Sequence, residues 1–455
     1  MRKITIAVGL YLGLLWGANA QQKSLANSAN YKVKKLKLEE VNLVSSYYHQ
    51  EGNNSAVTGG IGTEKLTDFG NTLDLKWVKT DSKNRKHSLT VDMGVDTYTS
   101  ASSDKINPNP VTQGTLTGAS SSSGSSSNIQ PVTQTVSSAS GKGGGRSKPS
   151  RITSDPNAVI SLTSASYRDT RVYPTIGWSV RDEKAGTTFG ISGSASTEYD
   201  YKSLGGSLNF VKSSRDNNRE FGVKINAFFD TWSVILPVEL RPVGYGSGAK
   251  SDPTPIDYKP RQSFSATFSW SQVINSRLQV AVIAEPSYQQ GLLSTPYHRV
   301  YFNNGSEGLE TLPGTRLKLP VAFRANYFLG DKIIFRTFYR FYQDDWGMTA
   351  HTANLETSIR LSPFFVVSPF YRFNTQTAID YFAPYQQNAA TSEFHTSDYD
   401  VSALQSHFVG TGVKLMPMNG VMNWKHFNSL ELRVGHYMRS TGLVANSVTL
   451  AAKFK

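Results

Sequence analysis

Residues 221–229 read FGVKINAFF, and the spacing of their apolar side chains decides the fold. Phe221, Val223, Ile225, Ala227 and Phe229 stand at every second position. Successive side chains of a β-strand point to opposite faces, so this period of two predicts a strand with one apolar face. The same alternation occurs in LTVDMGVD at 89–96, FSATFSW at 264–270 and LKLPVAF at 317–323.

Segments with this alternation recur about 16 times along the chain, and each is about ten residues long. An even number of antiparallel strands of this length is typical of a bacterial outer-membrane barrel. We therefore predict an all-β fold: a transmembrane antiparallel up-and-down β-barrel of about 16 strands with long extracellular loops. The predicted strands are 41–50, 71–80, 87–99, 169–181, 187–200, 203–212, 220–231, 262–273, 277–289, 315–328, 332–344, 352–361, 364–376, 400–415, 428–440 and 443–454.

The lengths of the connections support the barrel independently. In such a barrel the turns on the periplasmic side are short and the loops on the outer side are longer. The predicted turns are 81–86, 182–186, 213–219, 274–276, 329–331, 362–363 and 416–427. The long insertions, at 51–70, 100–168, 232–261, 290–314 and 377–399, all fall on the other side. This parity predicts that both termini of the mature chain lie in the periplasm.

The N-terminus predicts export. Arg2 and Lys3 precede an apolar run at 4–16, and the small residues Ala18 and Ala20 mark a cleavage site, which is the layout of a signal peptide over 1–20. We expect a short periplasmic segment at 21–40 and an outer-membrane β-barrel at 41–455. The tract 115–150 is rich in Ser and Gly, so we expect a disordered external loop there. The predicted localisation is the bacterial outer membrane.

Composition limits the partners and the chemistry. The formal net charge is +13, a basic excess that often indicates nucleic acid, but export makes nucleic acid an unsuitable partner. The chain has no cysteine, which excludes disulfides, thiolate metal sites and a lipoprotein anchor. We expect contact with outer-membrane lipid and no cofactor. The last strand ends at Phe454, one residue before the terminal Lys455, and we expect insertion by the barrel assembly machinery.

Charged residues on the polar faces of the predicted strands form two groups. Because the apolar faces must contact lipid, the interleaved polar side chains line the lumen. The acidic group comes from the early strands: Asp74, Asp92, Asp96, Glu198 and Asp230. The basic group comes from the later strands: Arg316, Arg324, Arg336, Arg340, Arg360, Arg372 and Arg433. Either the two walls create a field across an open pore, or the charges pair and stabilise a closed barrel.

Further polar residues gather near the outer strand ends and in external loops. The candidates for binding there are Asp200, Asp344, Asp345, His351, Asp380, Asp398 and Asp400. Clustered oxygen ligands suit a hard cation such as calcium, but a solvated rim paired with Lys and Arg is the simpler interpretation, so whether a metal binds is unknown. External aromatic residues, Tyr297, Tyr301 and Trp346, are candidates for a carbohydrate platform.

Histidines and serines in the predicted external loops are candidates for a hydrolase site. His298, His351 and His395 lie in predicted external loops, and Ser294 and Ser397 are near two of them. Serine commonly occurs within a few residues of histidine in loop-rich proteins, so this pattern is weak support for a nucleophile and its base. We expect no catalytic residues and no enzyme activity.

Several loop and rim stretches are similar to a family of bacterial outer-membrane barrel proteins, the domain of unknown function 3570. The stretches are SYYHQEGNNSAVTGG at 46–60, DTYTSASS at 96–103, QGLLSTP at 290–296, DDWGMTAHT at 344–352, DYFAPY at 380–385 and TSDYD at 396–400. The resemblance implies an outer-membrane barrel, brings no catalytic residues, and suggests an envelope lipoprotein as a candidate partner. Because these stretches are external, we expect the loops to fold together over the mouth.

Three hypotheses for the function follow. The first is a porin-like channel for small polar or charged solutes. The second is a closed barrel that acts as a scaffold or receptor for an envelope lipoprotein or a surface partner. The third, with the weakest support, is an outer-membrane hydrolase.

Overall fold

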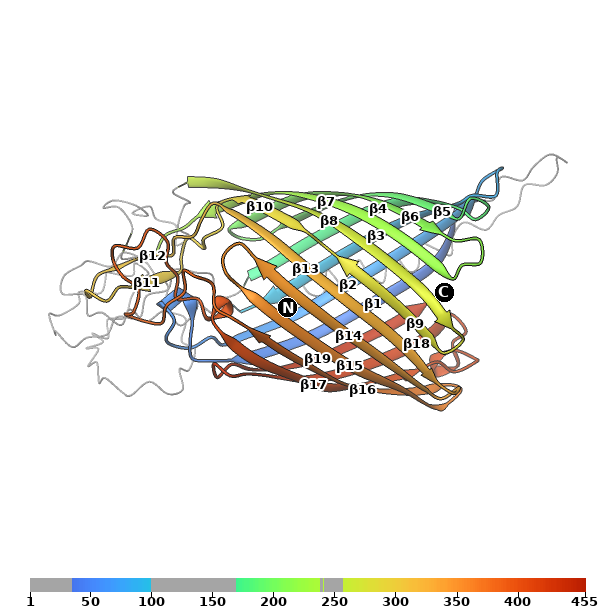
Figure 1. The fold of residues 1–455 in the computed structure, drawn as a ribbon. Helices are drawn as coiled ribbons and strands as arrows, with labels where there is room; N and C mark the ends of the chain where they lie inside the picture. The colour runs from blue at the N-terminus through green and yellow to red at the C-terminus, as the bar shows by residue number, and fades with distance from the viewer. Residues whose placement is uncertain (1–34, 100–168, 238–239, 241–256) are drawn as a thin grey trace, which may run out of the picture.

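The computed structural model describes residues 35–99, 169–237, 240 and 257–455, and the remaining residues are drawn in grey in Figure 1. The predicted signal peptide at 1–20 and the Ser/Gly tract at 115–150 lie outside the described residues. Of the predicted periplasmic segment at 21–40, the part from 37 onward belongs to the first strand.

The described strands form one closed antiparallel sheet (Figure 1). They are β1 (Lys37–Glu51), β2 (Leu66–Thr80), β3 (Lys86–Tyr98), β4 (Asp169–Asp182), β5 (Thr187–Thr197), β6 (Tyr201–Ser213), β7 (Arg219–Val234), β8 (Asp257–Asn275), β9 (Leu278–Ala284), β10 (Ser287–Gly291), β13 (Thr315–Leu329), β14 (Ile333–Asp344), β15 (Thr349–Ser362), β16 (Phe365–Gln376), β17 (Leu404–Leu415), β18 (Phe427–Arg439) and β19 (Val444–Phe454). Consecutive strands pair in order, and β1 pairs with β19, which closes the barrel.

The barrel has 16 strand positions, although 17 strands are labelled in its sheet, because β9 and β10 together occupy one position. Both β9 and β10 pair with β8 on one side and with β13 on the other. The break between them falls at Glu285 and Pro286, and a proline has no N–H to donate to the ladder. The prediction of an antiparallel up-and-down barrel of about 16 strands is confirmed.

The predicted strand bounds differ from the structure mainly at the outer ends. β8 begins at Asp257, five residues before the predicted start at 262. The predicted strand 187–200 ends at Thr197. The predicted strand 400–415 begins later, at Leu404, because a 3-10 turn, η4 (Tyr399–Val401), comes first. The carboxylate of Asp398 accepts a hydrogen bond from the backbone N of Asp400 and so caps this turn.

The outer surface of the barrel is apolar. On β13 the side chains of Leu317, Leu319 and Phe323 are 52%, 48% and 45% exposed, and they alternate with the polar residues of the inner face. Similar exposed apolar residues occur on the other strands. Such a surface on a closed barrel fits the hydrocarbon of a bilayer, because each strand pairs with a neighbour on both sides and the sheet has no open edge. No helix in the described part of the chain is long and apolar enough to cross a membrane.

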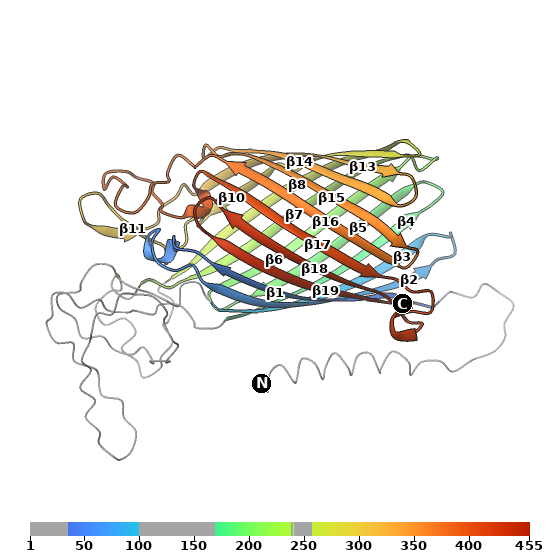
Figure 2. The ribbon, with the colours of Figure 1, turned by 90° about the horizontal axis from the view of Figure 1, so that it is seen from below.

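The two ends of the barrel differ as the connection lengths predict. Short turns and the C-terminus lie at one end, and the long loops lie at the other (Figures 1 and 2). The long-loop end includes the short pair β11 (Arg299–Tyr301) and β12 (Glu307–Leu309), and the 3-10 turns η1 (Ala56–Thr58) and η4. At the short-turn end, η5 (Val421–Asn423) lies in the turn between β17 and β18.

Candidate functional site

The structure places the predicted luminal charges on the inner face. The clearest evidence is a pair of salt bridges on the basic wall. Arg336 on β14 and Arg433 on β18 both form ion pairs with Glu356 on β15, at 2.7 and 2.6 Å. Two strands, β16 and β17, separate β15 from β18 in the sheet. The side chains can therefore meet only across the concave inner side, as the parity of the strands predicts.

Several other arginines on this wall have no ionic partner among the described residues. Arg324, Arg340 and Arg360 point inward and are exposed, and none of them forms an ion pair within the part of the chain that the structure describes. Arg372 is also exposed and lies over the ring of Phe408 at 5.9 Å. An inward side chain can be solvent-exposed only if the space beside it is open. The lumen along this wall is therefore water-accessible.

The opposite wall is less acidic than the sequence analysis predicts. Asp74 and Asp92 lie directly opposite each other on β2 and β3, and Asp96 accepts a hydrogen bond from the Tyr173 hydroxyl at 2.9 Å. Asp230 is buried, with Arg261 at 3.1 Å.

Basic residues also stand on this wall, because Arg171 and Lys224 line a luminal cavity there. The cavity has a volume of about 460 Å³ and is bounded by residues of β4 to β8. Its wall is rich in hydroxyl groups, including those of Ser192, Ser194 and Tyr201. The predicted division of the lumen into a basic and an acidic wall is therefore incomplete. The inward parity of Arg171 and Lys224 could have been found in the sequence.

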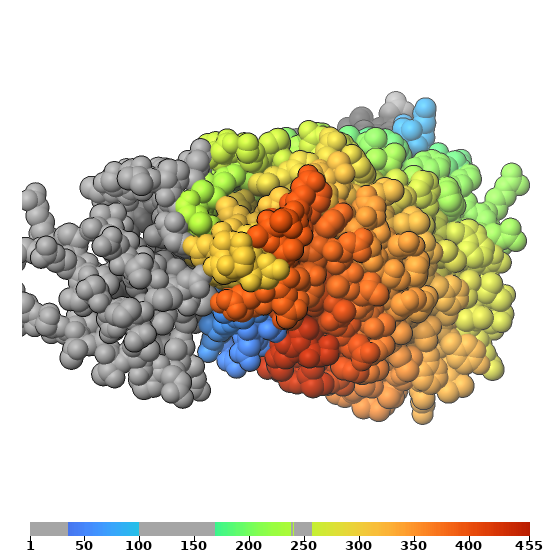
Figure 3. Space-filling model, turned by 60° about the vertical axis from the view of Figure 1, so that its left-hand side comes forward, coloured from blue at the N-terminus to red at the C-terminus, as the bar shows by residue number. Residues whose placement is uncertain are grey.

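Three long loops, 52–65, 292–314 and 377–403, pack together over the mouth, and we refer to them as the cap. Figure 3 shows their blue, yellow and orange residues side by side at one end of the barrel. Arg299 and Tyr301 are 1% exposed, and Arg299 donates a hydrogen bond of 2.6 Å to the carbonyl oxygen of Val57. Gly59 has a φ of 75°, and a Cβ there would lie 2.5 Å from the Tyr301 ring. The expectation that the loops fold together is thus met.

A second buried cluster joins the cap to the barrel rim. It contains Trp346, Met348 and Ile379. Asp344, whose side chain is fully buried, accepts hydrogen bonds from Arg316, from the Tyr342 hydroxyl and from the backbone N of Trp346 and Met348. Asp344 therefore holds the rim together, and it is not a free binding residue. Of the three aromatic residues predicted as a carbohydrate platform, Tyr301 and Trp346 are buried and cannot take part, and Tyr297 is partly exposed.

The other rim candidates do not form one site. Asp345 accepts a hydrogen bond from the backbone N of Leu317, and Asp400 pairs with Arg439 at 2.7 Å. His351 lies on β15 rather than in a loop, between the inward Ala350 and Thr352. Its ring faces outward and contacts the Tyr339 hydroxyl at 2.7 Å. Asp200 lies in the connection between β5 and β6, together with Glu198 of the predicted acidic wall, and Asp380 lies in the connection between β16 and β17.

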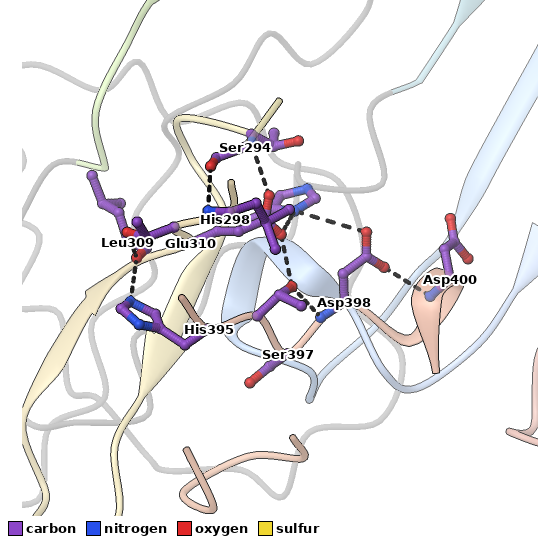
Figure 4. Close-up of polar contacts among 12 residues, drawn as sticks. Ser294, His298, Leu309, Glu310, His395, Ser397, Asp398 and Asp400 are labelled. Carbon is purple, nitrogen blue, oxygen red and sulfur yellow. Dashed lines mark hydrogen bonds and ion pairs between the residues drawn. The ribbon is translucent and has the colours of Figure 1, made fainter. Parts of the chain in front are cut away.

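Polar side chains converge in the cap at His298 (Figure 4). Its Nδ1 atom lies 3.3 Å from Oε2 of Glu310 and 4.0 Å from Oδ2 of Asp398. The Glu310 carboxylate accepts hydrogen bonds from the backbone N of Thr295 and from the Thr396 hydroxyl, both at 2.7 Å. Asp398 was a candidate from the sequence, whereas Glu310 was missed, because nothing distinguishes one carboxylate within a long loop.

Burial and charge act against each other in this cluster. Burial alone would lower the pKa of His298, but the Glu310 and Asp398 carboxylates outweigh it and raise that pKa. Burial would raise the pKa of Glu310, but His298 and the hydrogen bonds lower it. Burial dominates at Asp398 and raises its pKa to about 6 even though His298 opposes the shift.

The serines near these histidines are held in structural hydrogen bonds. Ser294 Oγ accepts a hydrogen bond of 2.8 Å from the backbone N of Leu312. Ser397 Oγ donates to the carbonyl oxygen of Ala383 and accepts from Asn388, both at 3.0 Å. Neither hydroxyl contacts the ring of His298 or His395 among the described residues. The arrangement that a serine hydrolase needs is therefore not assembled here.

Comparisons with known proteins give a family and a set of barrels. The family described as "Protein of unknown function (DUF3570)" matches residues 12–446. None of the curated proteins matches the chain. Among solved structures, Pseudomonas aeruginosa OccK1 (OpdK) is 6% identical, with a TM-score of 0.38 over 91% of this chain and 97% of that one. A BenF-like porin from Pseudomonas fluorescens Pf-5 is 9% identical, with a TM-score of 0.37 over 91% and 98%.

Proposed function

This chain belongs to the DUF3570 family of proteins of unknown function, and we propose that it is an outer-membrane channel for small polar solutes that favours anions. The observation that carries the proposal is a set of exposed, inward arginines, Arg324, Arg340 and Arg360, that have no ionic partner among the described residues. A closed, salt-bridged barrel would bury or pair these side chains, because an isolated charge in a dry interior is costly.

Electrostatics supports a preference for anions. Two unit charges 4 Å apart interact by about 1 kcal/mol in bulk water and by about 4 kcal/mol at the effective dielectric constant near a protein surface. An anion passing several unpaired guanidinium groups gains part of this energy at each one, whereas a cation is repelled. On the opposite wall, Arg261 neutralises Asp230, so the acidic side attracts cations less strongly than its residue count suggests.

The luminal cavity supports a small solute. Its volume of about 460 Å³ lies within the range of small-molecule sites. Arg171 and Lys224 supply positive charge at its wall, and serine and tyrosine hydroxyls supply hydrogen-bond donors. A solute with a carboxylate or phosphate group suits this lining better than an apolar one does.

Charge reversal tests the proposal. In planar bilayers, Arg324→Glu combined with Arg340→Glu should shift the zero-current potential in a KCl gradient toward that of a cation-selective pore. Lys184→Glu is the matched control, because it reverses a charge in an exposed short turn between β4 and β5 and should leave selectivity unchanged. The proposal fails if correctly folded wild-type protein is silent, or if the luminal variant retains the selectivity of the wild type.

The cap supports a second candidate function, a scaffold or receptor. Its buried Arg299 and Tyr301 show loops that pack into a defined surface rather than extending freely. Such a surface could dock an envelope lipoprotein or a surface partner, as the sequence analysis also suggests. Recovery of a stoichiometric partner from native membranes, lost on Gly59→Ala, would favour this function, and its repeated absence would count against it.

A further inference from the structure

One imidazole nitrogen in the cap faces two carboxylates. His298 Nδ1 lies 3.3 Å from Glu310 Oε2 and 4.0 Å from Asp398 Oδ2, and the ligand atoms of the three residues all lie within 4.8 Å of one another. Nitrogen and oxygen ligands bound about 2.0–2.2 Å from a metal ion are separated by about 3.0–3.5 Å. The first pair already has this spacing, and a small rotation of Asp398 brings in the third ligand. We propose that the cap binds a divalent transition-metal ion at His298, Glu310 and Asp398.

The charge of the cluster favours a cation. The Glu310 side chain is 4% exposed and that of Asp398 is 24% exposed. Within the described ranges, neither carboxylate forms an ion pair with a lysine or arginine, and Arg439 is already paired with Asp400. Even a protonated His298 leaves two carboxylates with one positive charge. Buried charge of this kind is stable when it is paired or coordinates a metal, and a divalent ion would neutralise both carboxylates.

The surrounding hydrogen bonds orient the ligands and leave the binding atoms available. Asp398 Oδ1 accepts from the backbone N of Asp400 at 2.8 Å, so Oδ2 remains for the ion. Glu310 Oε1 accepts from the backbone N of Thr295. His298 Nε2 has no hydrogen-bond partner in the described part of the chain, so it can carry the ring proton while Nδ1 binds the metal. Glu310 Oε2 also accepts from the Thr396 hydroxyl at 2.7 Å, and a carboxylate oxygen has a second lone pair for the ion. The hydrogen bond that the ion would replace is the one between His298 and Glu310.

The ligand types indicate the class of metal. One imidazole nitrogen with two carboxylates suits zinc, manganese or iron, whereas calcium prefers oxygen ligands alone. Three protein ligands leave at least one position for water or a solute group. The ion would also join the loop 292–314 to the loop 377–403, and so hold the cap in one arrangement.

Metal titration of the full-length, detergent-solubilised protein tests this site. After removal of metals with a chelator, Zn²⁺ should bind at one site per chain by calorimetry, and Co²⁺ should give a visible absorption that Zn²⁺ abolishes. His298→Gln and Asp398→Asn should each weaken binding by about tenfold or more. Asp398→Asn retains an acceptor for the Asp400 backbone. His351→Gln is the matched control, because that histidine lies on the outer face of β15.

Several results would overturn the proposal. They are no saturable Zn²⁺ binding by the folded wild type, binding in both ligand variants equal to that of the His351→Gln control, and selective binding of Ca²⁺. The Co²⁺ spectrum is measured on the wild type, so it decides the question even if a variant disturbs the cap. The metal site and the channel are separate proposals. A failure of the metal titration would leave the proposed channel standing, and a silent bilayer recording would leave the metal site standing.

Discussion

Substitution of Asp344 by alanine should open the junction between the cap and the barrel. The Asp344 side chain is fully buried and accepts from Arg316, the Tyr342 hydroxyl and the backbone N of Trp346 and Met348. Removing one partner of a buried ion pair costs about 3–5 kcal/mol, because the remaining charge loses its compensation. The adjacent Asp345→Ala is the control: it is exposed and loses one hydrogen bond to Leu317 N, so we expect about 1 kcal/mol.

Hydrogen exchange with mass spectrometry measures this difference locally. If exchange follows the opening equilibrium, 3 kcal/mol corresponds to exchange that is about 100-fold faster, since each 1.4 kcal/mol is a factor of about ten. The increase should appear in peptides that contain Trp346 and Met348, and strand peptides such as those of β5 should not change. Equal exchange rates in the Asp344→Ala and Asp345→Ala variants would refute the structural role given to Asp344.

Three further predictions concern the cap and the outer face. Gly59→Ala should destabilise the cap by about 1–2 kcal/mol or more, because φ is 75° and a Cβ would lie 2.5 Å from the Tyr301 ring; faster exchange in 52–65 would show it, and unchanged exchange would argue against the packing. The cap should be most stable at about pH 4, between the ordinary pKa values of Asp398, 3.8, and Glu310, 4.5. A raised pKa for Asp398, from 3.8 to about 6, costs stability as pH rises through that interval, and the stabilisation from the raised pKa of His298 is lost as pH rises above 6.5. Glu310 has a lowered pKa, so its contribution is lost as pH falls below 4.5. Intrinsically corrected exchange in 292–314 should follow this profile, and Asp398→Asn should remove the part between pH 4 and 6. Finally, His351→Leu should leave conductance unchanged, because the ring lies on the outer face, and a change in single-channel current would contradict that placement.

The barrel could be predicted from the sequence because the pattern that specifies each strand lies within about ten consecutive residues. Alternation such as that of Phe221, Val223 and Ile225 reports two different environments directly, lipid on one face and lumen on the other. The same parity placed Arg336, Glu356 and Arg433 on one inner wall, where the structure brings them together. Strand ends were less predictable, because a side-chain cap at Asp398 competes with strand pairing at Asp400.

The cap could be predicted only as an assembly of loops. Asp344 and Tyr301 have residue types that suggest binding, but their burial depends on contacts with distant segments. The cluster at His298 combines residues 12 and 100 positions apart in the chain, which no periodic pattern links. Glu310 therefore could not be chosen among the acidic residues, whereas Asp398 was noticed through its position near a strand end.

The most direct test of the channel is the zero-current potential of the purified wild-type protein in a planar bilayer with a KCl gradient. Folding must first be confirmed, for example by circular dichroism. The exposed arginines of the inner wall predict steady conductance and a potential with the sign of an anion-selective pore. A folded protein that conducts no current, or one that selects cations, would contradict the proposed function.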